Sequence, residues 1–256
     1  LRDNQMQGYL SGLGRKIASA NKLEGNPYKY NFTVVDVPMV NAFALPAGTV
    51  FVTTPLIEMA DSEAELAGVV GHEIGHIQAR HTAERMHAAK KSEGKSLWYA
   101  VGGGLLGGAL GYGLGTMLCK PKDKKCLTKA ATIGAGAGVG GGLLIQKYQF
   151  MANSREDEME ADRIGFKTSV AAGYDKDHVG RFYEKLLKME QRGKQSGNAL
   201  LSSVADAMST HPPSRERVAQ MREMAGQATS KGRVRTPSFA SIRNNAVAYT
   251  KRHKKG

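Results

Sequence analysis

Cysteine is scarce in this sequence: its 256 residues contain two, Cys119 and Cys126. A small domain held together by disulfides needs more, so that class of protein is excluded. The pair brackets a short polar loop, and a disulfide there would close about eight residues and indicate an oxidising compartment. Two free thiols are the alternative. The 31 glycines follow no three-residue period, which excludes a collagen-like chain.

Acidic residues are absent from residues 227–256, which carry eight Lys or Arg. Those eight leave only +5 of the formal net charge of +13 for residues 1–226. We therefore expect a globular domain over 1–226 and a basic, solvated C-terminal tail over 227–256. Such a tail can contact anionic lipid or nucleic acid. A nucleic-acid partner is not favoured, because the excess charge lies in a tail rather than on a folded face.

Charged residues are also missing from two long stretches, residues 96–119 and 130–146. Glycines four residues apart recur between positions 101 and 142, a pattern that lets two helices approach closely and is commonest inside membranes. The first stretch is long enough to span a bilayer and the second is marginal. We expect a Gly-rich helical hairpin at about 96–146, inserted into the domain and packed on it or against a membrane. Spanning the bilayer is the alternative.

The remaining pattern predicts a mostly helical α+β domain with a small antiparallel sheet. Apolar residues at near-helical spacing predict a helix within residues 1–24. Residues 32–37, 40–45 and 49–53 read as strands, and Pro46-Ala47-Gly48 reads as the turn between the last two. Asp61 or Ser62 can then cap a helix that nothing breaks before about Lys90.

The most specific motif is His72-Glu73-Ile74-Gly75-His76, which falls inside that predicted helix. Positions i and i+4 share one helix face, so two neutral imidazoles can bind one Zn²⁺ while Glu73 leans over the same site without binding it. A catalytic zinc has three protein ligands and an open position for water, so a third ligand must come from elsewhere in the chain.

An acidic stretch at residues 156–162 can supply that third ligand. Glu158 and Asp162 share a helix face, so Glu158 could bind the metal while Asp162 orients a ligand imidazole. Glu156, Asp157 and Glu160 compete for the role, and spacing alone does not decide between them.

Taken together, these two motifs resemble the HtpX and CAAX-prenyl-protease family of zinc metallopeptidases (metallopeptidase family 48). More narrowly, the chain is similar to the soluble bacterial branch that includes the periplasmic proteins BepA and LoiP. Further matching segments run in family order from about residue 41 to 217: Asn41-Ala42-Phe43-Ala44-Leu45-Pro46 with Gly48, Ser154-Arg155, Ala172-Gly173-Tyr174-Asp175 and Ser209-Thr210-His211-Pro212-Pro213.

The resemblance implies a zincin-like (gluzincin) fold and one Zn²⁺ per chain. The implied ligands are His72, His76 and Glu158, with Glu73 as general base and Asp162 behind the ligands. His211 is implied to lie near the metal, where it stabilises the reaction intermediate or caps the zinc at rest. Arg217 is a candidate support for the same loop. Membrane members of the family carry transmembrane helices where this chain has its Gly-rich stretch.

We expect residues 40–45 to form an edge strand beside the metal. The small side chains of Ala42 and Ala44, flanked by Asn41 and Phe43, leave room for an extended peptide to add as a further strand. A plain core hairpin is the alternative. The other histidines, including His81, match no ligand spacing and are expected in surface or capping positions.

The predicted function is a zinc-dependent endopeptidase acting on polypeptide substrates. The resemblance implies a periplasmic setting, peripheral to a membrane, in which the substrates are misfolded or unassembled envelope proteins. A membrane surface or an outer-membrane assembly machinery is the further partner it implies. The rival from another class is a membrane-associated assembly or chaperone-like binding factor with a mostly capped zinc site.

Overall fold

The computed structural model describes residues 3–20, 28–46, 48–85, 87, 153–196 and 200–255. Nearly all of them belong to one compact unit, formed by residues 1–82 and 152–256. The Gly-rich hairpin predicted at 96–146, with Cys119 and Cys126, lies outside the described residues. Among the residues described, no helix combines the length and the apolar character needed to cross a bilayer.

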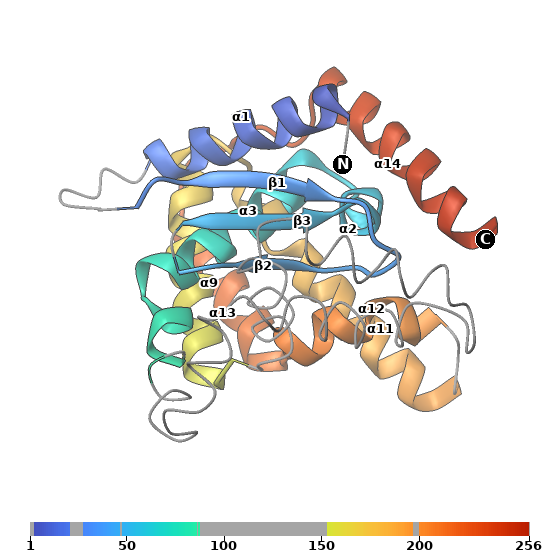
Figure 1. Cartoon of the computed structure of the whole chain (residues 1–256). Coiled ribbons are helices and arrows are strands. Elements are labelled where there is room, and N and C mark those ends of the chain that lie inside the picture. Colours follow the sequence, from blue (N-terminus) through green and yellow to red (C-terminus); the bar gives the residue numbers. More distant parts are fainter. Residues whose placement is uncertain are drawn as a thin grey trace. The chain divides into compact units, whose positions relative to one another are not determined.

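Helices dominate the described ranges, and one small sheet accompanies them, as predicted (Figure 1). The strands are β1 (Asn31–Val35), β2 (Ala42–Ala44) and β3 (Thr49–Thr53). The helices are α1 (Asn4–Ala20), α2 (Thr54–Met59), α3 (Glu63–Gln78), α9 (Arg155–Ala171), α10 (Lys176–Val179), α11 (Arg181–Ser196), α12 (Leu200–Thr210), α13 (Arg215–Gln227) and α14 (Pro237–Lys255).

The sheet has the order β1-β3-β2 and is mixed, so the prediction of an antiparallel sheet is wrong in part. The predicted hairpin is present: β2 and β3 are antiparallel, with Phe43 opposite Phe51, and Gly48 adopts a φ of +98° in the turn. β1 runs parallel to β3. The reason is that residues 36–41 carry the chain across the end of β3, so β2 returns along its far side.

The core around α3 is formed by apolar residues of the sheet and of α1. They alternate along the strands and recur at helical spacing along α1. Phe32 and Val34 of β1 are buried while their neighbours are not, which is the period of a strand with one face on a core. α1 packs against β1 and α3, and the sheet packs on α3 through β2 and β3. The buried side chains of α1 include Leu10, Leu13 and Ile17, which the sequence pattern predicts, and also Met6.

α3 begins as predicted but ends early. Ser62 caps it by accepting a hydrogen bond from the Glu65 backbone N–H at 3.1 Å. The helix stops at Gln78, well before Lys90, because Arg80 adopts a left-handed φ of 62°. Residues 81–85 are helical again after that turn, and His81 lies against His76 of α3.

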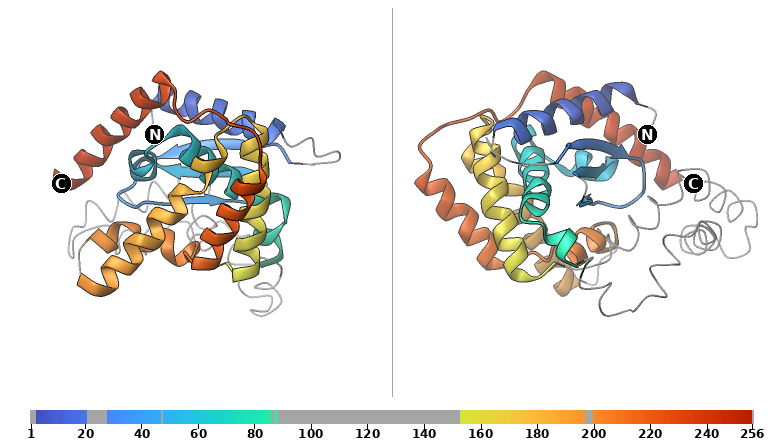
Figure 2. Two further views of the ribbon diagram at one scale, coloured as in Figure 1. Left: turned by 180° about the vertical axis from the view of Figure 1, so that it is seen from behind. Right: turned by 60° about the vertical axis from the view of Figure 1, so that its left-hand side comes forward.

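The segment after residue 226 is folded, so the expectation of a solvated tail is wrong. The backbone of Arg233 bonds with that of Gly173 and Asp175, and α14 then packs against α2 and α1. Figures 1 and 2 show α14 meeting the N-terminal end of α1 and running away from it at an angle. Phe239, Ile242 and Ala246 are buried in this contact. Their spacing of three and four residues is helical, although the sequence analysis interpreted this basic segment as a solvated tail.

Candidate metal centre

α3 carries His72, Glu73 and His76 into the interior of the domain. The Nε2 atoms of the two histidines lie 3.0 Å apart, and all three side chains are almost completely buried. This is the i, i+4 geometry that the motif predicts. Two imidazole nitrogens so close together in a buried site need a proton or a cation between them.

α9 crosses α3 at a distance that only small residues permit, and Figure 2 shows the two helices side by side. A Cβ added to Gly75 would come within 2.6 Å of the Ala161 carbonyl oxygen. A Cβ added to Gly165 would come within 2.5 Å of the His72 backbone nitrogen. The glycine inside the histidine motif therefore has a packing reason, since it lets α9 approach the face of α3 that carries His72 and His76.

This crossing brings Glu158 onto the two histidines. Its Oε1 lies 3.1 Å from His76 Nε2 and its Oε2 lies 3.3 Å from His72 Nε2. Its competitors do not reach: Glu156 and Glu160 are exposed and Asp157 is half-buried. The Asp157 carboxylate instead closes a capping box with Ser154 at the start of α9.

His211, just after α12, supplies a fourth donor atom to the cluster. Its Nδ1 lies 3.2 Å from His72 Nε2 and 3.1 Å from Glu158 Oε1. The donor atoms of His72, His76, Glu158 and His211 all lie within 4.8 Å of one another. For zinc–ligand bonds of 2.0–2.1 Å, the edge of a ligand tetrahedron is about 3.3 Å. The observed spacings of 3.0–3.3 Å and the nitrogen and carboxylate donors therefore fit a zinc ion.

Behind the ligands, Asp162 and Arg217 form a buried ion pair. Asp162 Oδ1 lies 2.8 Å from His72 Nδ1, the position from which a carboxylate orients a metal-binding imidazole. The Arg217 guanidinium donates through Nε and Nη2 to both Asp162 oxygens, at 2.7 and 2.8 Å. Its Nη1 reaches Glu158 Oε2 at 2.6 Å and donates to the Pro212 carbonyl oxygen at 3.0 Å. Arg217 thus holds the carboxylates as well as the His211 loop for which the sequence analysis proposed it.

His81 is a site residue that the sequence analysis missed. It is buried, with its Nδ1 2.9 Å from His76 Nδ1, and its Nε2 lies 3.4 Å from Glu160 Oε2. His81 comes five residues after His76, a spacing that does not share a helix face, so periodicity pointed away from it. The left-handed Arg80 is what brings it back.

Asn153, also missed, is a second buried polar residue at the cluster. Its Nδ2 donates to the Thr210 carbonyl oxygen at 3.0 Å and lies 3.3 Å from His211 Nδ1 and 3.4 Å from His76 Nε2. The Thr210 contact fixes the amide orientation, since the reverse one would set two carbonyl oxygens against each other. One amide N–H therefore faces the ligand atoms.

The electrostatics of the cluster favour ionised carboxylates. Burial alone would raise the pKa of Glu158, but His211 and Arg217 hold it well below its usual range. Asp162 behaves in the same way, because Arg217 outweighs the effect of burial on its pKa. Burial would lower the pKa of His72, yet Glu158 and Asp162 raise it to about 9. At His76, burial and the nearby His72 keep the pKa well below its usual range.

The edge strand predicted for substrate borders this cluster. In the β2–β3 pairing, Asn41 and Leu45 bond to β3, so the backbone groups of Ala42 and Ala44 point to the free edge. His211 Nε2 lies 3.3 Å from the Ala42 carbonyl oxygen and 3.4 Å from Glu73 Oε1. A narrow cavity here is lined by Asn41, Ala42, Glu73, Tyr183 and His211 among others. The Phe43 ring stacks on Phe51, with centroids 4.9 Å apart.

Comparison with known proteins agrees with this geometry. Peptidase family M48 matches residues 4–225. Mitochondrial metalloendopeptidase OMA1 of Arabidopsis thaliana is 35% identical over 200 residues, which cover 78% of this chain and 32% of that protein. The beta-barrel assembly-enhancing protease of Escherichia coli K12 is 29% identical over 227 residues, 89% of this chain and 40% of that protein. OMA1 of Schizosaccharomyces pombe is 28% identical over 223 residues, 87% of this chain and 54% of that protein.

This chain therefore spans from 32% to 54% of the length of these relatives. The family match, in contrast, extends over most of the chain and contains every residue of the buried cluster. The chain belongs to peptidase family M48, a family of metallopeptidases.

Proposed function

We propose that this chain is a zinc-dependent endopeptidase that binds one Zn²⁺ through His72, His76 and Glu158. The observation that carries the proposal is the buried set of donor atoms at tetrahedral spacings, with Glu73 on the same helix. Family membership supports it independently. When bound, zinc would lower the pKa of a water molecule and polarise the scissile carbonyl group.

In this proposal Glu73 is the general base. It takes a proton from the attacking water and later delivers that proton to the leaving amine. Its side chain is buried beside the cluster rather than among the ligands, which suits a group that must stay free to exchange a proton. Asp162 acts through His72 by orienting the ring and increasing its basicity.

The substrate would add to β2 as an extended strand and pair with the outward-facing backbone groups of Ala42 and Ala44. It would displace His211 from the Ala42 carbonyl oxygen and Thr82 from the Ala44 carbonyl oxygen. Asn41 supports this role, because its Nδ2 is buried at the cavity and has no partner there among the described residues. A carbonyl oxygen of the substrate would satisfy that donor. Phe43 would hold β2 in position by stacking on Phe51 of β3.

His211 has two roles open to it in the proposal. With Nδ1 among the ligand atoms it would cap the zinc at rest, and after displacement by substrate it would donate a hydrogen bond to the reaction intermediate. The position of Nδ1 also favours the second candidate function, a binding or assembly factor whose zinc stays capped. A fourth protein ligand is typical of structural zinc sites.

The proposed setting is the bacterial periplasm, peripheral to a membrane, with misfolded or unassembled envelope proteins as substrates. The sequence resemblance supports it, as does the name of the relative in Escherichia coli, a beta-barrel assembly-enhancing protease. Outer-membrane assembly machinery would then be a partner. Other relatives are named mitochondrial metalloendopeptidases.

The first test measures zinc content and casein hydrolysis in the parent protein and in Glu73→Gln. We expect zinc in both and cleavage only in the parent. Glu158→Gln should lose zinc, whereas Glu156→Gln, a change to an exposed residue of the same helix, should keep it. Zinc without cleavage in the parent, and cleavage after His211→Ala, would identify a capped peptidase. A folded parent without zinc would contradict the proposal.

A further inference from the structure

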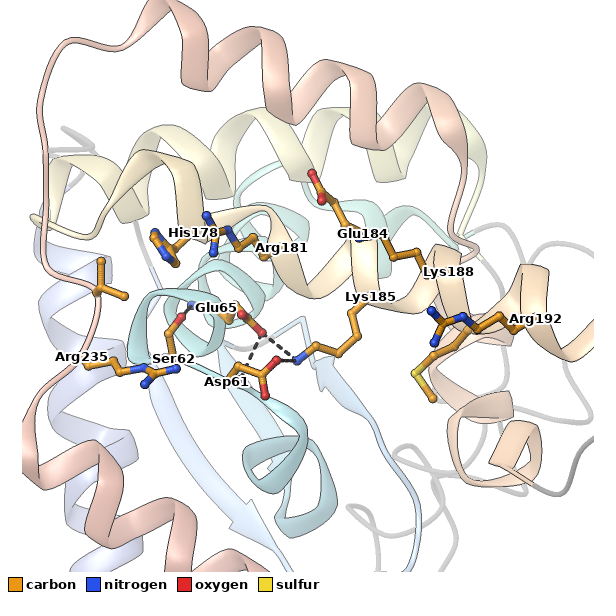
Figure 3. Close-up of a pocket in the computed structure, with 12 residues that line it drawn as sticks. Asp61, Ser62, Glu65, His178, Arg181, Glu184, Lys185, Lys188, Arg192 and Arg235 are labelled. Carbon is orange, nitrogen blue, oxygen red and sulfur yellow. Dashed lines mark hydrogen bonds and ion pairs between the residues drawn. The ribbon is translucent and has the colours of Figure 1, made fainter.

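A large open cavity lies on the side of α11 that faces away from the metal centre. Its volume is about 850 Å³, and it is lined by α11, the start of α3 and the segment before α14 (Figure 3). α11 separates this cavity from the metal centre. The helix turns Tyr183 and Leu186 towards the metal-site cavity and Arg181 and Lys185 towards this one.

Basic side chains follow one face of α11 along this cavity. Arg181, Lys185, Lys188 and Arg192 are spaced by four, three and four residues, and Arg235 faces them from the segment before α14. We call this set of five the basic groove. At about 1.5 Å per residue the α11 part is about 17 Å long. That length matches about five residues of an extended peptide.

The acidic residues that line the groove already have partners. Asp61 and Glu65 pair with Lys185 at 2.6 and 3.0 Å, as the dashed lines in Figure 3 show. Glu184 pairs with Arg222, which lies outside the groove, at 2.9 Å. The lining therefore carries five basic and three acidic side chains, an excess of two positive charges.

Three cations of the groove form no ion pair with a carboxylate in the part of the chain that the structure describes. They are Arg181, Lys188 and Arg235, and all three are exposed. Arg181 uses only its Nε, which donates to the Asp177 carbonyl oxygen at 2.9 Å. Unpaired guanidinium and ammonium groups around a hollow are suited to bind carboxylates, which Arg can hold through two parallel hydrogen bonds.

We propose that the basic groove binds an acidic segment of the polypeptide substrate. A hollow of this length accommodates an extended chain better than it does the flat surface of a bilayer, and Met189 and Val234 offer apolar contacts to the stems of Asp and Glu side chains. The groove and the metal centre lie on opposite faces of one helix, whose diameter with side chains is about 10–12 Å. A single unfolded chain can therefore reach both. That the acidic segment belongs to a substrate rests on the proposed peptidase function. That the groove binds an acidic segment does not.

The binding test uses Glu73→Gln protein, so that cleavage does not interfere, and a fluorescent peptide of alternating Glu and Ser. The groove variant is Lys188→Glu with Arg235→Glu. The matched control is Lys167→Glu with Lys251→Glu, which changes the net charge equally at exposed positions outside the groove. We expect Kd to rise at least about tenfold in the groove variant and less than about twofold in the control. A peptide of Gln and Ser should not bind.

Several outcomes would overturn the proposal. If both variants bound the peptide equally weakly, the loss would come from net charge and not from the groove. If the Glu73→Gln protein without further changes did not bind the acidic peptide, the proposed site would not exist. Binding of vesicles that contain anionic lipid, lost in the groove variant while the acidic peptide does not bind, would identify a membrane contact instead.

The second arm compares two peptide substrates that differ only in a Glu/Ser or a Gln/Ser extension. The acidic extension should lower KM in the parent without changing kcat, and the groove variant should lose that difference. If the parent cleaves neither substrate but the acidic peptide binds through the groove, the peptidase function fails and the acidic-segment site stands. Equal KM values for the two substrates in an active parent would overturn the role of the groove in substrate binding.

Discussion

The Nδ1 atoms of His76 and His81 lie 2.9 Å apart in the interior of the domain. Two ring nitrogens at this distance share one proton, so one of them donates and the other accepts. If His76 Nε2 binds zinc, His76 carries its proton on Nδ1, and this N–H donates a hydrogen bond to His81 Nδ1. His81 is then protonated on Nε2, the atom that faces Glu160 and Asp157 at 3.4 and 3.7 Å. His81 thus orients His76 as Asp162 orients His72.

His81→Ala should therefore weaken zinc binding about 10–100-fold, the usual cost of removing a group that orients a metal ligand. Competition with a chromophoric chelator measures the affinity. His81→Asn should restore part of the loss, because its side-chain oxygen can accept the same hydrogen bond. His253→Ala is the control, since His253 pairs with Asp36 away from the metal centre. An unchanged zinc affinity in His81→Ala would show that the contact does not orient the ligand.

Arg217→Ala should lower the free energy of unfolding by about 3–5 kcal/mol, because it leaves buried carboxylates without their cation. Urea denaturation of the metal-free protein measures the change. Arg217→Lys should recover only part of it, since an ammonium group cannot hold both Asp162 oxygens through a planar fork. Arg222→Ala is the matched control, because the Arg222–Glu184 pair is exposed to water and contributes little. Equal stability of the two alanine variants would contradict the structure.

Gly75→Ala should cost about 1–3 kcal/mol, because its Cβ would press on the Ala161 carbonyl and push α9 away from α3. The same displacement would move Glu158 from the two histidines, so zinc affinity should fall as well. Gly8→Ala, on the exposed face of α1 with nothing near its Cβ, should instead stabilise the protein by about 0.5–1 kcal/mol. Thermal unfolding and zinc titration of the two variants test the pair. A tolerated Gly75→Ala would mean that the helices are not in close contact.

Zinc binding near pH 7.5 should release about one proton. Glu158 and Asp162 raise the pKa of His72 to about 9 in the metal-free protein, so His72 is protonated there and must lose that proton to bind zinc. The apparent affinity should rise about tenfold per pH unit and level off near pH 9. Calorimetric titration in buffers of different ionisation enthalpy counts the protons. The absence of proton release would mean that His72 is neutral before zinc binds.

The same shift has a consequence for the stability of the metal-free protein. A raised pKa means that the folded state holds a proton that the unfolded state releases, so this contribution is complete below about pH 6.5 and is lost as the pH rises through about 9. Metal-free protein should therefore unfold at lower urea concentration at pH 9.5 than at pH 7. A His72→Gln variant should lose that difference.

Much of the metal centre could be predicted from local patterns. The spacing of His72 and His76 determines that they share a helix face, and the resemblance decided for Glu158 where the acidic stretch itself left several candidates. The hairpin before α2 and the Ser62 cap followed in the same way from turn and capping residues. Predictions failed where distant segments decide the result. β1 is parallel to β3 because of a crossover, and α14 is packed because α1 and α2 offer it an apolar surface.

By itself the sequence determined the family, the main residues of the candidate metal centre and the helical character of the chain, because these depend on residue types at short, regular spacings. Only the tertiary structure decided what stands behind the ligands. The fork of Arg217 on Asp162, the contact of His81 with His76 and the amide of Asn153 join residues 5 to 77 positions apart. Such contacts arise from the close crossing of α3 and α9 and from the left-handed Arg80. The spacing of residues within a single segment therefore cannot predict them.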